Sequence, residues 1–512
     1  MSGYLRRLAS TGAAYTAASI LSKLIAVALL PLYTRFLSPA DYGAAEVMFA
    51  AVVAASIVIR LGVIEALLRF YYKTDEVPDR VVATSFAVLF WAGTIAALVL
   101  LPFAGPISDL LLGESEPELA RIAIGGLWVL TLSEYLLTIF RLDERSRAFF
   151  VFTVASVLVT IPVTVLLVVF LDLGAQGLLL GSYGTGVVFV GALIVYHHKR
   201  LSLVPDRALT KRMMRFGLPT MPAELSLYSL SFIDRIIIAR TLGLAEAGLY
   251  SLAIKVAQSV NVLVRGFQLA FPPLAYSIVD DDEARRAYSL VVTWFVVVMA
   301  VVITGIWLTA PWIVRIFAAP EYFEAYKAVG PVAAGTALYA IYMVLLVVLG
   351  RTGRTEFNFP ATLAGVGSNI VLNLILVPAW GIVGAAVSLV ISYTLVLILM
   401  YIFTQRLFPV PYEWFRLSKV LFSSAALIAL GTLLVPIEGF PELAIRLLIF
   451  ACLPLALLLT GFFSPEERRY LAMIRRPREL ISNLRATETG EDADRGLSEV
   501  YEVEQMNEDM RN

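Results

Sequence analysis

Residues 149–171 read FFVFTVASVLVTIPVTVLLVVFL, an unbroken run of 23 positions without a charged side chain. A helix needs about 20 mainly apolar residues to cross the roughly 30 Å hydrocarbon core of a bilayer, so this segment is long enough to span one. Backbone polar groups in lipid have to be hydrogen-bonded within their own segment. The run therefore predicts a transmembrane helix.

Comparable apolar runs recur along the whole chain. Hydrophobic residues make up 59% of the 512 positions and charged residues only 16%, against roughly 25% charge in a soluble domain. The sequence therefore predicts an all-α polytopic membrane protein with about 14 transmembrane helices. They are expected near residues 13–37, 44–68, 81–101, 120–140, 149–171, 174–196, 216–239, 247–270, 288–310, 328–349, 357–378, 382–403, 417–435 and 443–463.

The basic residues lie mainly in alternate loops, and this sets the predicted orientation. With a cytoplasmic N-terminus, the cytoplasmic loops and tails hold about 26 Lys or Arg near the membrane and the opposite loops about four. Cytoplasmic loops of membrane proteins are enriched in these residues. Both termini are therefore predicted on the cytoplasmic side of the cytoplasmic (inner) membrane. The acidic tail, residues 464–512, has few apolar residues and is predicted to be disordered.

Several functional classes lack their sequence signals. The net charge is zero, which argues against a nucleic-acid partner. The single cysteine, Cys452, lies in an apolar run and supports neither a disulfide framework nor a metal site. We find no glycine-rich phosphate loop, metal-ligand cluster or nucleophile elbow. The sequence therefore predicts no cofactor, no metal and no enzymatic activity.

Two halves of the chain align at an offset of about 205 residues. Asp41 aligns with Glu246, Gly43 with Gly248 and Arg60 with Arg265. Residues 174–177 align in the same way with residues 381–384. The copies start six spans apart and so cross the membrane in the same direction. We predict lobes at 1–198 and 216–404, a basic linker at 199–215 and two appended helices at 405–463; in transporters such parallel repeats are related by an axis along the membrane normal.

Charged side chains fall inside several predicted spans, where they are costly and usually face a cavity or a partner. The cations among them are Lys23, Arg60, Arg235, Lys255 and Arg265. Arg60 and Arg265 recur in register, at a depth in the cytoplasmic half of the membrane. Because a guanidinium binds phosphate oxygens in a bidentate manner, this pair is predicted to hold a phosphate or diphosphate.

The same charged residues could instead have purely structural roles. Arg60 could pair with Glu65, Lys23 could neutralise Glu46, and Asp234 with Arg235 could join the lobes. The buried carboxylates are also candidates for coupling transport to an ion gradient, and they comprise Glu46, Glu65, Glu224 and Asp234.

These stretches resemble the oligosaccharide flippases (polysaccharide biosynthesis proteins) of the multidrug/oligosaccharidyl-lipid/polysaccharide exporter superfamily. The resemblance covers nearly all of the chain to about residue 463. It is carried in order by residues 19–24, 31–39 and 42–43, then 217–219, 234–235, 242–243 and 248–250, and finally Asn369, Asn373, Pro378 and 381–385.

The resemblance implies two six-helix lobes in a V around a central cavity. It also implies translocation of a polyprenyl-diphosphate-linked oligosaccharide to the outer leaflet by alternating access. In such proteins cations on the first, second, seventh and eighth spans line the cavity, which here match Lys23, Arg60, Arg235, Lys255 and Arg265. Membrane lipids and the polysaccharide assembly machinery are the expected partners.

Three alternatives are consistent with parts of this pattern. A multidrug and toxin extrusion (MATE-like) exporter of drugs or metabolites shares the fold, but a cationic cavity would repel its hydrophobic cations. A lipid II flippase shares the expected spans and cavity. A membrane polymerase or ligase of lipid-linked glycans usually needs a large outer loop, whereas no outside loop predicted here exceeds about 20 residues.

Overall fold

The computed structural model describes residues 28–72, 76–435, 439–463 and Glu467. Within these residues the chain is built from helices and contains no strand. The predicted all-α class is therefore confirmed. Lys23, most of the first predicted span and the tail at 464–512 apart from Glu467 lie outside the described residues.

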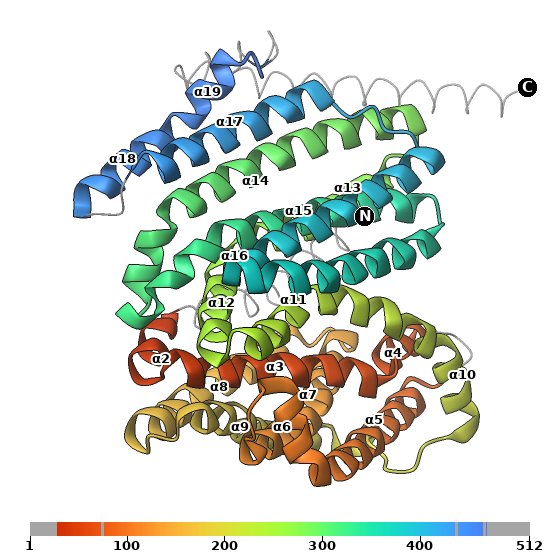
Figure 1. Cartoon of the computed structure of the whole chain (residues 1–512). Helices are drawn as coiled ribbons and strands as arrows, with labels where there is room; N and C mark the ends of the chain where they lie inside the picture. The colour runs from red at the N-terminus through yellow and green to blue at the C-terminus, as the bar shows by residue number, and fades with distance from the viewer. Residues whose placement is uncertain (1–27, 73–75, 436–438, 464–466, 468–512) are drawn as a thin grey trace, which may run out of the picture.

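The first half of the chain forms a helical lobe in the lower part of Figure 1. Its helices are α2 (Leu30–Phe36), α3 (Pro39–Arg60), α4 (Val63–Tyr71), α5 (Pro78–Leu100), η1 (Leu101–Phe103), α6 (Ala104–Leu112), α7 (Pro117–Leu142), α8 (Ser146–Val165), η2 (Leu166–Phe170), α9 (Gly174–His197) and η3 (His198–Arg200). We refer to it as the N-lobe.

The linker helices α10 (Arg207–Gly217) and η4 (Leu218–Thr220) lead into the second half. We refer to this half as the C-lobe. It consists of α11 (Met221–Thr241), α12 (Leu244–Ala257), η5 (Gln258–Val260), α13 (Asn261–Ser277), α14 (Asp281–Phe317), η6 (Pro320–Ala325), α15 (Tyr326–Arg351), η7 (Thr355–Phe357) and α16 (Asn358–Leu407), with α17 (Trp414–Leu433), α18 (Gly439–Ala451) and α19 (Leu453–Leu459) appended.

Helix α3 runs along the boundary between the lobes, and local sequence sets both of its ends. Ser38 caps the start by accepting a hydrogen bond from the backbone of Asp41, and Pro39 occupies the first turn, where its missing N–H costs nothing. The helix stops at Leu61 and Gly62, which have left-handed backbone angles with φ of 51° and 67°. A fixed segment of α3 is therefore presented to the C-lobe.

Ten of the described helices are long and apolar enough to cross a membrane, or eleven if the bent pair of α12 and α13 counts as one span. The predicted number of fourteen is not confirmed. Helix α16 has 50 residues but loses helical geometry at Gly381, the boundary between two predicted spans. Helix α11 is not among the candidates, and it carries Glu224, Asp234 and Arg235.

The lobes meet where two repeat-related glycines cross. A Cβ atom on Gly43 of α3 would lie 1.9 Å from the carbonyl oxygen of Leu244, and one on Gly248 of α12 would lie 2.0 Å from that of Pro39. Only glycine allows the two backbones to approach this closely. The glycine pair aligned by the repeat in the sequence therefore lies at the lobe interface.

The appended helix α18 contacts α14 through a buried arginine. Arg446 of α18 pairs with Glu442 at 2.9 Å and donates a hydrogen bond to the carbonyl oxygen of Leu308 on α14 at 3.2 Å. Both charged side chains are almost fully buried. A buried charge has to be paired and hydrogen-bonded, so these contacts fix α18 against the C-lobe.

Candidate functional site

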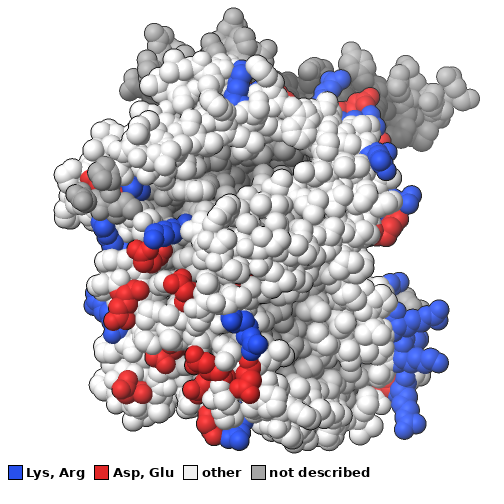
Figure 2. Space-filling view, in the orientation of Figure 1, with Lys and Arg blue, Asp and Glu red and all other residues white. Residues whose placement is uncertain are grey.

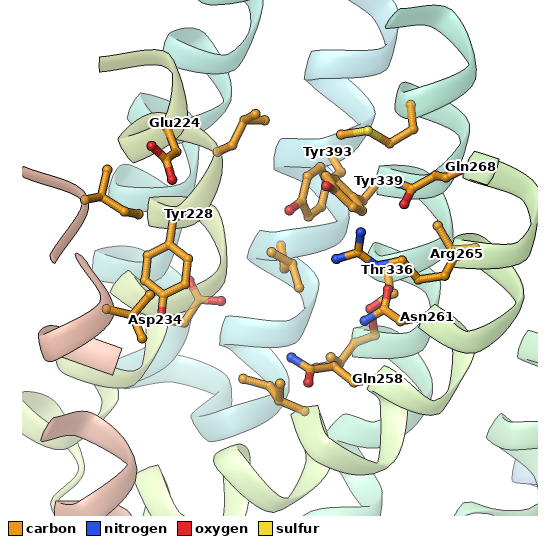
Figure 3. Close-up of a pocket in the computed structure, with 18 of the residues that line it drawn as sticks. Glu224, Tyr228, Asp234, Gln258, Asn261, Arg265, Gln268, Thr336, Tyr339 and Tyr393 are labelled. Atoms are coloured by element: carbon orange, nitrogen blue, oxygen red, sulfur yellow. The ribbon is translucent and has the colours of Figure 1, made fainter. Parts of the chain in front are cut away.

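A cavity of about 740 Å³ lies between the lobes. The N-lobe contributes α3 and α7 to its lining, and the C-lobe contributes α11, α12, η5, α13, α15 and α16. Figure 3 shows Glu224, Tyr228 and Asp234 on one side of the space, and Arg265, Gln268, Tyr339 and Tyr393 on the other. The described lining therefore combines charged, amide and aromatic groups from both lobes.

Arg60 is the last residue of α3 and lines one side of this cavity, where it pairs with carboxylates of both lobes. Its guanidinium pairs with Glu134 of α7 in the N-lobe. It also donates a hydrogen bond to Oε1 of Glu224, on α11 of the C-lobe, at 2.9 Å. The Arg60 side chain is only 12% exposed, whereas the two carboxylates are about 40% exposed. We call these three residues the Arg60 cluster.

Close backbone packing accompanies the Arg60 cluster. A Cβ atom on Gly62 would lie 1.9 Å from the carbonyl oxygen of Gly217, and one on Gly217 would lie 2.2 Å from that of Gly62. Gly62 follows α3, and Gly217 ends α10 at the entry to the C-lobe. The N-lobe and the linker are thus in direct contact at this end of the cavity.

Arg265 of α13 is the other arginine in the lining. Its side chain is exposed, and it makes no ion pair with any carboxylate of the described residues. In Figure 3 it points into the cavity beside Thr336 and Asn261. A guanidinium carries five N–H donors and cannot be deprotonated in proteins. Arg265 is therefore a cation available to an anionic ligand.

Glu46 lies nearer the start of α3 and pairs with two cations of the C-lobe. It is 4% exposed and accepts from Lys255 of α12. Arg235 of α11 approaches the same carboxylate at 3.4 Å. We call Glu46, Arg235 and Lys255 the Glu46 cluster. At 1.5 Å per residue it lies about 21 Å along α3 from Arg60.

Asp234 also lines the cavity but has neutral partners. It is 1% exposed and accepts hydrogen bonds of 2.8 Å from the hydroxyl of Tyr250 and from the amide of Asn373. Both polar atoms of the Asn369 amide, Oδ1 and Nδ2, and Oδ1 of Asn373 are buried without a hydrogen-bond partner among the described residues. Buried polar atoms without partners are rare in native structures, so this network offers acceptor atoms to a further group.

Comparisons with known proteins address the family. Residues 32–327, more than half of the chain, match a family model described as "Polysaccharide biosynthesis protein". The chain belongs to this family. It is 25% identical over 318 residues to the succinoglycan biosynthesis transport protein ExoT of Rhizobium meliloti (strain 1021). That alignment covers 60% of the chain and 62% of the relative, less than two thirds of the relative's length.

Solved structures show which fold this polysaccharide biosynthesis protein has. It is similar to the lipid II flippase MurJ in an inward closed conformation, with a TM-score of 0.69 and 14% identity over 87% of this chain and 97% of that one. It is also similar to an inward-facing MATE transporter of the MOP superfamily, with a TM-score of 0.63 and 16% identity over 80% of this chain and 96% of that one. The resemblance seen in the sequence is confirmed, and the chain has the fold of these transporters.

The structure divides the predicted site residues of the polysaccharide biosynthesis protein into separate groups. Arg60 and Arg265 both line the cavity. Arg235 and Lys255 instead bind Glu46. The suggested Arg60–Glu65 pair is wrong for this structure, because Arg60 binds Glu134 and Glu224 and the half-buried Glu65 makes no ion pair with another described residue.

Glu134 was not predicted from the sequence, although a carboxylate inside the apolar helix α7 (Pro117–Leu142) was a visible signal. Neither the repeat nor the position of this charge in the sequence indicates a pair with Arg60, since 74 residues separate the two. The described lining also differs in charge from the expected cationic cavity. It holds two arginines, and its three carboxylates belong to Glu134, Glu224 and Asp234.

Proposed function

We propose that this protein moves a polyprenyl-diphosphate-linked oligosaccharide from the cytoplasmic to the outer leaflet by alternating access, for the synthesis of a surface polysaccharide. The observation that carries the proposal is an interlobe cavity whose lining includes the Arg60 cluster at the end of α3, together with a second interlobe ion-pair cluster, around Glu46, nearer the start of the same helix. Such a cavity opens to one side when one cluster separates. Membership of the polysaccharide biosynthesis protein family supports the same function.

The predicted orientation assigns the two ends of the cavity to the two sides of the membrane. With a cytoplasmic N-terminus, α3 begins outside, so the Glu46 cluster faces outward and the Arg60 cluster faces the cytoplasm. Figure 2 supports this direction: basic side chains gather at the right edge, where Figure 1 places α10, and acidic ones at the lower left. Basic residues are enriched on the cytoplasmic side of membrane proteins.

Arg265 is the group that we propose to bind the diphosphate first. Unlike Arg60, it does not have to leave a carboxylate to do so. Charge-assisted, bidentate contacts to phosphate are among the strongest hydrogen bonds in proteins. When the diphosphate draws Arg60 away from Glu224, the interlobe contact at the cytoplasmic end changes. Substrate binding is thereby linked to movement of the lobes.

Asp234 is the carboxylate that we propose to couple transport to an ion gradient. Glu46 and Glu224 already have cationic partners, whereas no lysine or arginine of the described residues forms an ion pair with Asp234. The unpaired amide oxygens of Asn369 and Asn373 add neutral ligands beside it. Oxygen-rich groups of this kind suit a hard monovalent cation, and Asp234 could equally take up a proton.

A depletion experiment tests the proposed function directly. Loss of the protein should cause one oligosaccharide-linked polyprenyl diphosphate to accumulate, protected from glycosidase added outside the cell and detected by mass spectrometry. Arg265→Ala should reproduce the accumulation, while Arg354→Ala, an exposed arginine paired with Glu356 outside the cavity, should not. Accumulation of lipid II instead would favour a lipid II flippase, and unchanged carrier pools with normal surface glycan would contradict the proposal.

A MATE-like exporter of organic cations is the second candidate, and the lining carboxylates are the observation that favours it. Three carboxylates and two arginines line the described cavity, so a lipophilic cation would not be repelled as the sequence analysis expected. Binding of lipophilic cations to the purified protein, without binding of lipid diphosphates, would favour this function. A polymerase or ligase is less consistent with the fold, because the solved structures to which this chain is similar are those of a flippase and a transporter.

A further inference from the structure

One side of the cavity is lined by amide side chains that the proposed diphosphate binding does not use. Gln258, Asn261 and Gln268 lie on the continuous path of η5 and α13, on either side of Arg265. Separations of four and three residues place Asn261, Arg265 and Gln268 on one helical face, and Gln258 comes one turn earlier, on η5. Figure 3 shows them together on this side of the space. We call Gln258, Asn261 and Gln268 the amide wall.

The amide wall is free to bind a ligand. None of its three side chains makes a hydrogen bond with any of the described residues, and each is exposed or half-exposed. A carboxamide offers two donors and one acceptor oxygen. Polar groups at membrane depth face a bundle interior or a water-filled cavity, where they mark substrate pathways. Three neighbouring amides therefore present alternating donors and acceptors to whatever fills this cavity.

The path of the helix places the amide wall at a bend. The segment 244–260, made of α12 and η5, and the segment 263–277 of α13 have axes that differ by 45°. Interrupted helices at membrane depth commonly form the binding sites of transporters. The bend directs Gln258 and the α13 residues into the same space, although they belong to two different helical segments.

Tyrosine rings border the same space. Tyr339 of α15 and Tyr393 of α16 have ring centroids 5.7 Å apart, and Tyr228 lines the opposite side. A tyrosine ring combines an apolar face with a polar hydroxyl. Apolar C–H faces of sugar rings pack on such aromatic faces, while sugar hydroxyls both donate and accept hydrogen bonds. Amides beside tyrosines are thus the combination that a saccharide requires.

The charges in the cavity restrict the kind of saccharide. Arg60 is engaged by Glu134 and Glu224, and Asp234 adds a third carboxylate to the described lining. Apart from Arg265, the lining therefore offers an acidic sugar little positive charge and several repulsive groups. A neutral, hydroxyl-rich sugar meets no such repulsion.

We propose that the amide wall binds the sugar next to the diphosphate, and that this sugar is neutral. The proposal rests on the proposed function, because it assumes that a lipid diphosphate binds at Arg265. The amide wall then recognises the sugar, and Arg265 recognises the diphosphate that every lipid-linked substrate shares. Substitutions in the two groups should have different effects on binding.

Binding by the full-length protein in lipid nanodiscs separates these effects. The probes are undecaprenyl diphosphate, the same lipid carrying glucose, and the same lipid carrying glucuronic acid, each titrated and quantified by native mass spectrometry. The wild-type protein should bind the glucose lipid more tightly than the other two. Asn261→Ala and Gln268→Ala should each weaken glucose-lipid binding by about three- to tenfold, since a neutral hydrogen bond is worth roughly that, and leave the bare lipid within twofold.

The control is Gln176→Ala, which removes a glutamine of α9 that does not line the cavity and should change nothing. If no lipid diphosphate binds the wild-type protein, the proposed function fails and the inference fails with it. If all three lipids bind in a manner that depends on Arg265 but not on the amide wall, only the inference is overturned. Tighter binding of the glucuronic acid lipid than of the glucose lipid would overturn the assignment of a neutral sugar.

Discussion

Replacing Glu46 by glutamine should open the end of the cavity at which α3 begins. Glu46 is the one residue of the Glu46 cluster on the N-lobe, and the cations Lys255 and Arg235 come from the C-lobe. Glutamine preserves the shape but removes the charge. Two cations then remain in a largely dry interface without a counter-ion, but only while the lobes are closed, because separation lets water solvate them. The substitution should therefore destabilise the closed arrangement selectively.

The size of the effect follows from the contact distances and burial. At 3.4 Å and an effective dielectric constant of about 20, two unit charges attract by about 5 kcal/mol before desolvation is subtracted. The net value of a hydrogen-bonded charged pair is about 1.5–3 kcal/mol. Taking about 2 kcal/mol, the open population should rise about 30-fold, since about 1.4 kcal/mol corresponds to a factor of ten.

A buried thiol reports this opening. Ser251 is fully buried on α12, three residues after Gly248 and four before Lys255, and so lies on the helical face that contacts α3. In a background in which the exposed Cys452 is serine, Ser251→Cys should react slowly with N-ethylmaleimide. Adding Glu46→Gln should accelerate the reaction about 30-fold, because fast closing makes the rate proportional to the open population.

The control removes a carboxylate from the surface near the same end of the N-lobe. Glu118 at the start of α7 is exposed and pairs with Arg121, so Glu118→Gln should leave the labelling rate within twofold. Lys255→Met should accelerate labelling less than Glu46→Gln, because Arg235 still holds the carboxylate. An unchanged rate in a well-folded Glu46→Gln protein would refute the assignment of this cluster to lobe closure, as would equal acceleration by the surface variant.

Three further predictions concern other contacts. Gly248→Leu places a side chain where even a Cβ atom would lie 2.0 Å from a backbone oxygen. We expect loss of the closed arrangement, measured as a lower Tm and as rapid labelling of Ser251→Cys. The control Gly243→Ala should cause only backbone strain, since no atom lies within 4 Å of a Cβ at that position. Asp234→Asn should abolish the dependence of transport in proteoliposomes on an imposed ion gradient while lipid-diphosphate binding persists, and a retained dependence would remove Asp234 from the coupling site. Asp206 caps α10, and the hydrogen bond from the backbone N–H of Leu209, followed by that from Arg80, lowers the pKa of its carboxyl. The cap should stabilise α10 at neutral pH and be lost only as the pH falls through this lowered pKa. Asp206→Ala should therefore lower the free energy of unfolding at pH 7, and the difference from the wild-type protein should shrink as the pH falls through that pKa.

The sequence was sufficient for the fold class because lipid imposes the same requirement on every span. Long apolar segments can satisfy their backbone only as helices, so composition and segment length predict the all-helical class without knowledge of packing. The repeat aligns Gly43 with Gly248, and the structure shows their helices in close contact, but the alignment alone does not place the two glycines at an interface. The number of spans is harder to predict. Whether the charged helix α11 crosses the membrane, and whether α16 is one span or two that meet at the non-helical Gly381, depends on tertiary packing that a hydropathy pattern does not contain.

Pairing inside the site was harder to predict because it depends on which helices are neighbours. Proximity in the chain suggested that Glu65 would pair with Arg60, but helix packing brings Glu134 and Glu224 to it, from 74 and 164 residues away. In the same way the sequence predicts Lys255 and Arg235 as cavity cations, whereas in the structure both pair with Glu46 on the facing helix. Buried charge can therefore be recognised in a sequence, whereas its partner requires the tertiary arrangement.

The different states of the two repeat-related arginines bear on how transport could begin. If Arg60 and Arg265 were both unpaired, a diphosphate would bind without changing any contact between the lobes, and a ligand with no preference for one arrangement shifts none. Here Arg265 is unpaired, while Arg60 joins the lobes through Glu224. In the proposed mechanism, a diphosphate held by Arg265 competes with Glu224 for Arg60, and the binding energy then favours the arrangement in which that contact is broken. The two arginines occupy positions that align in the sequence repeat, and the carboxylates Glu134 and Glu224 make only one of them part of the interlobe contact.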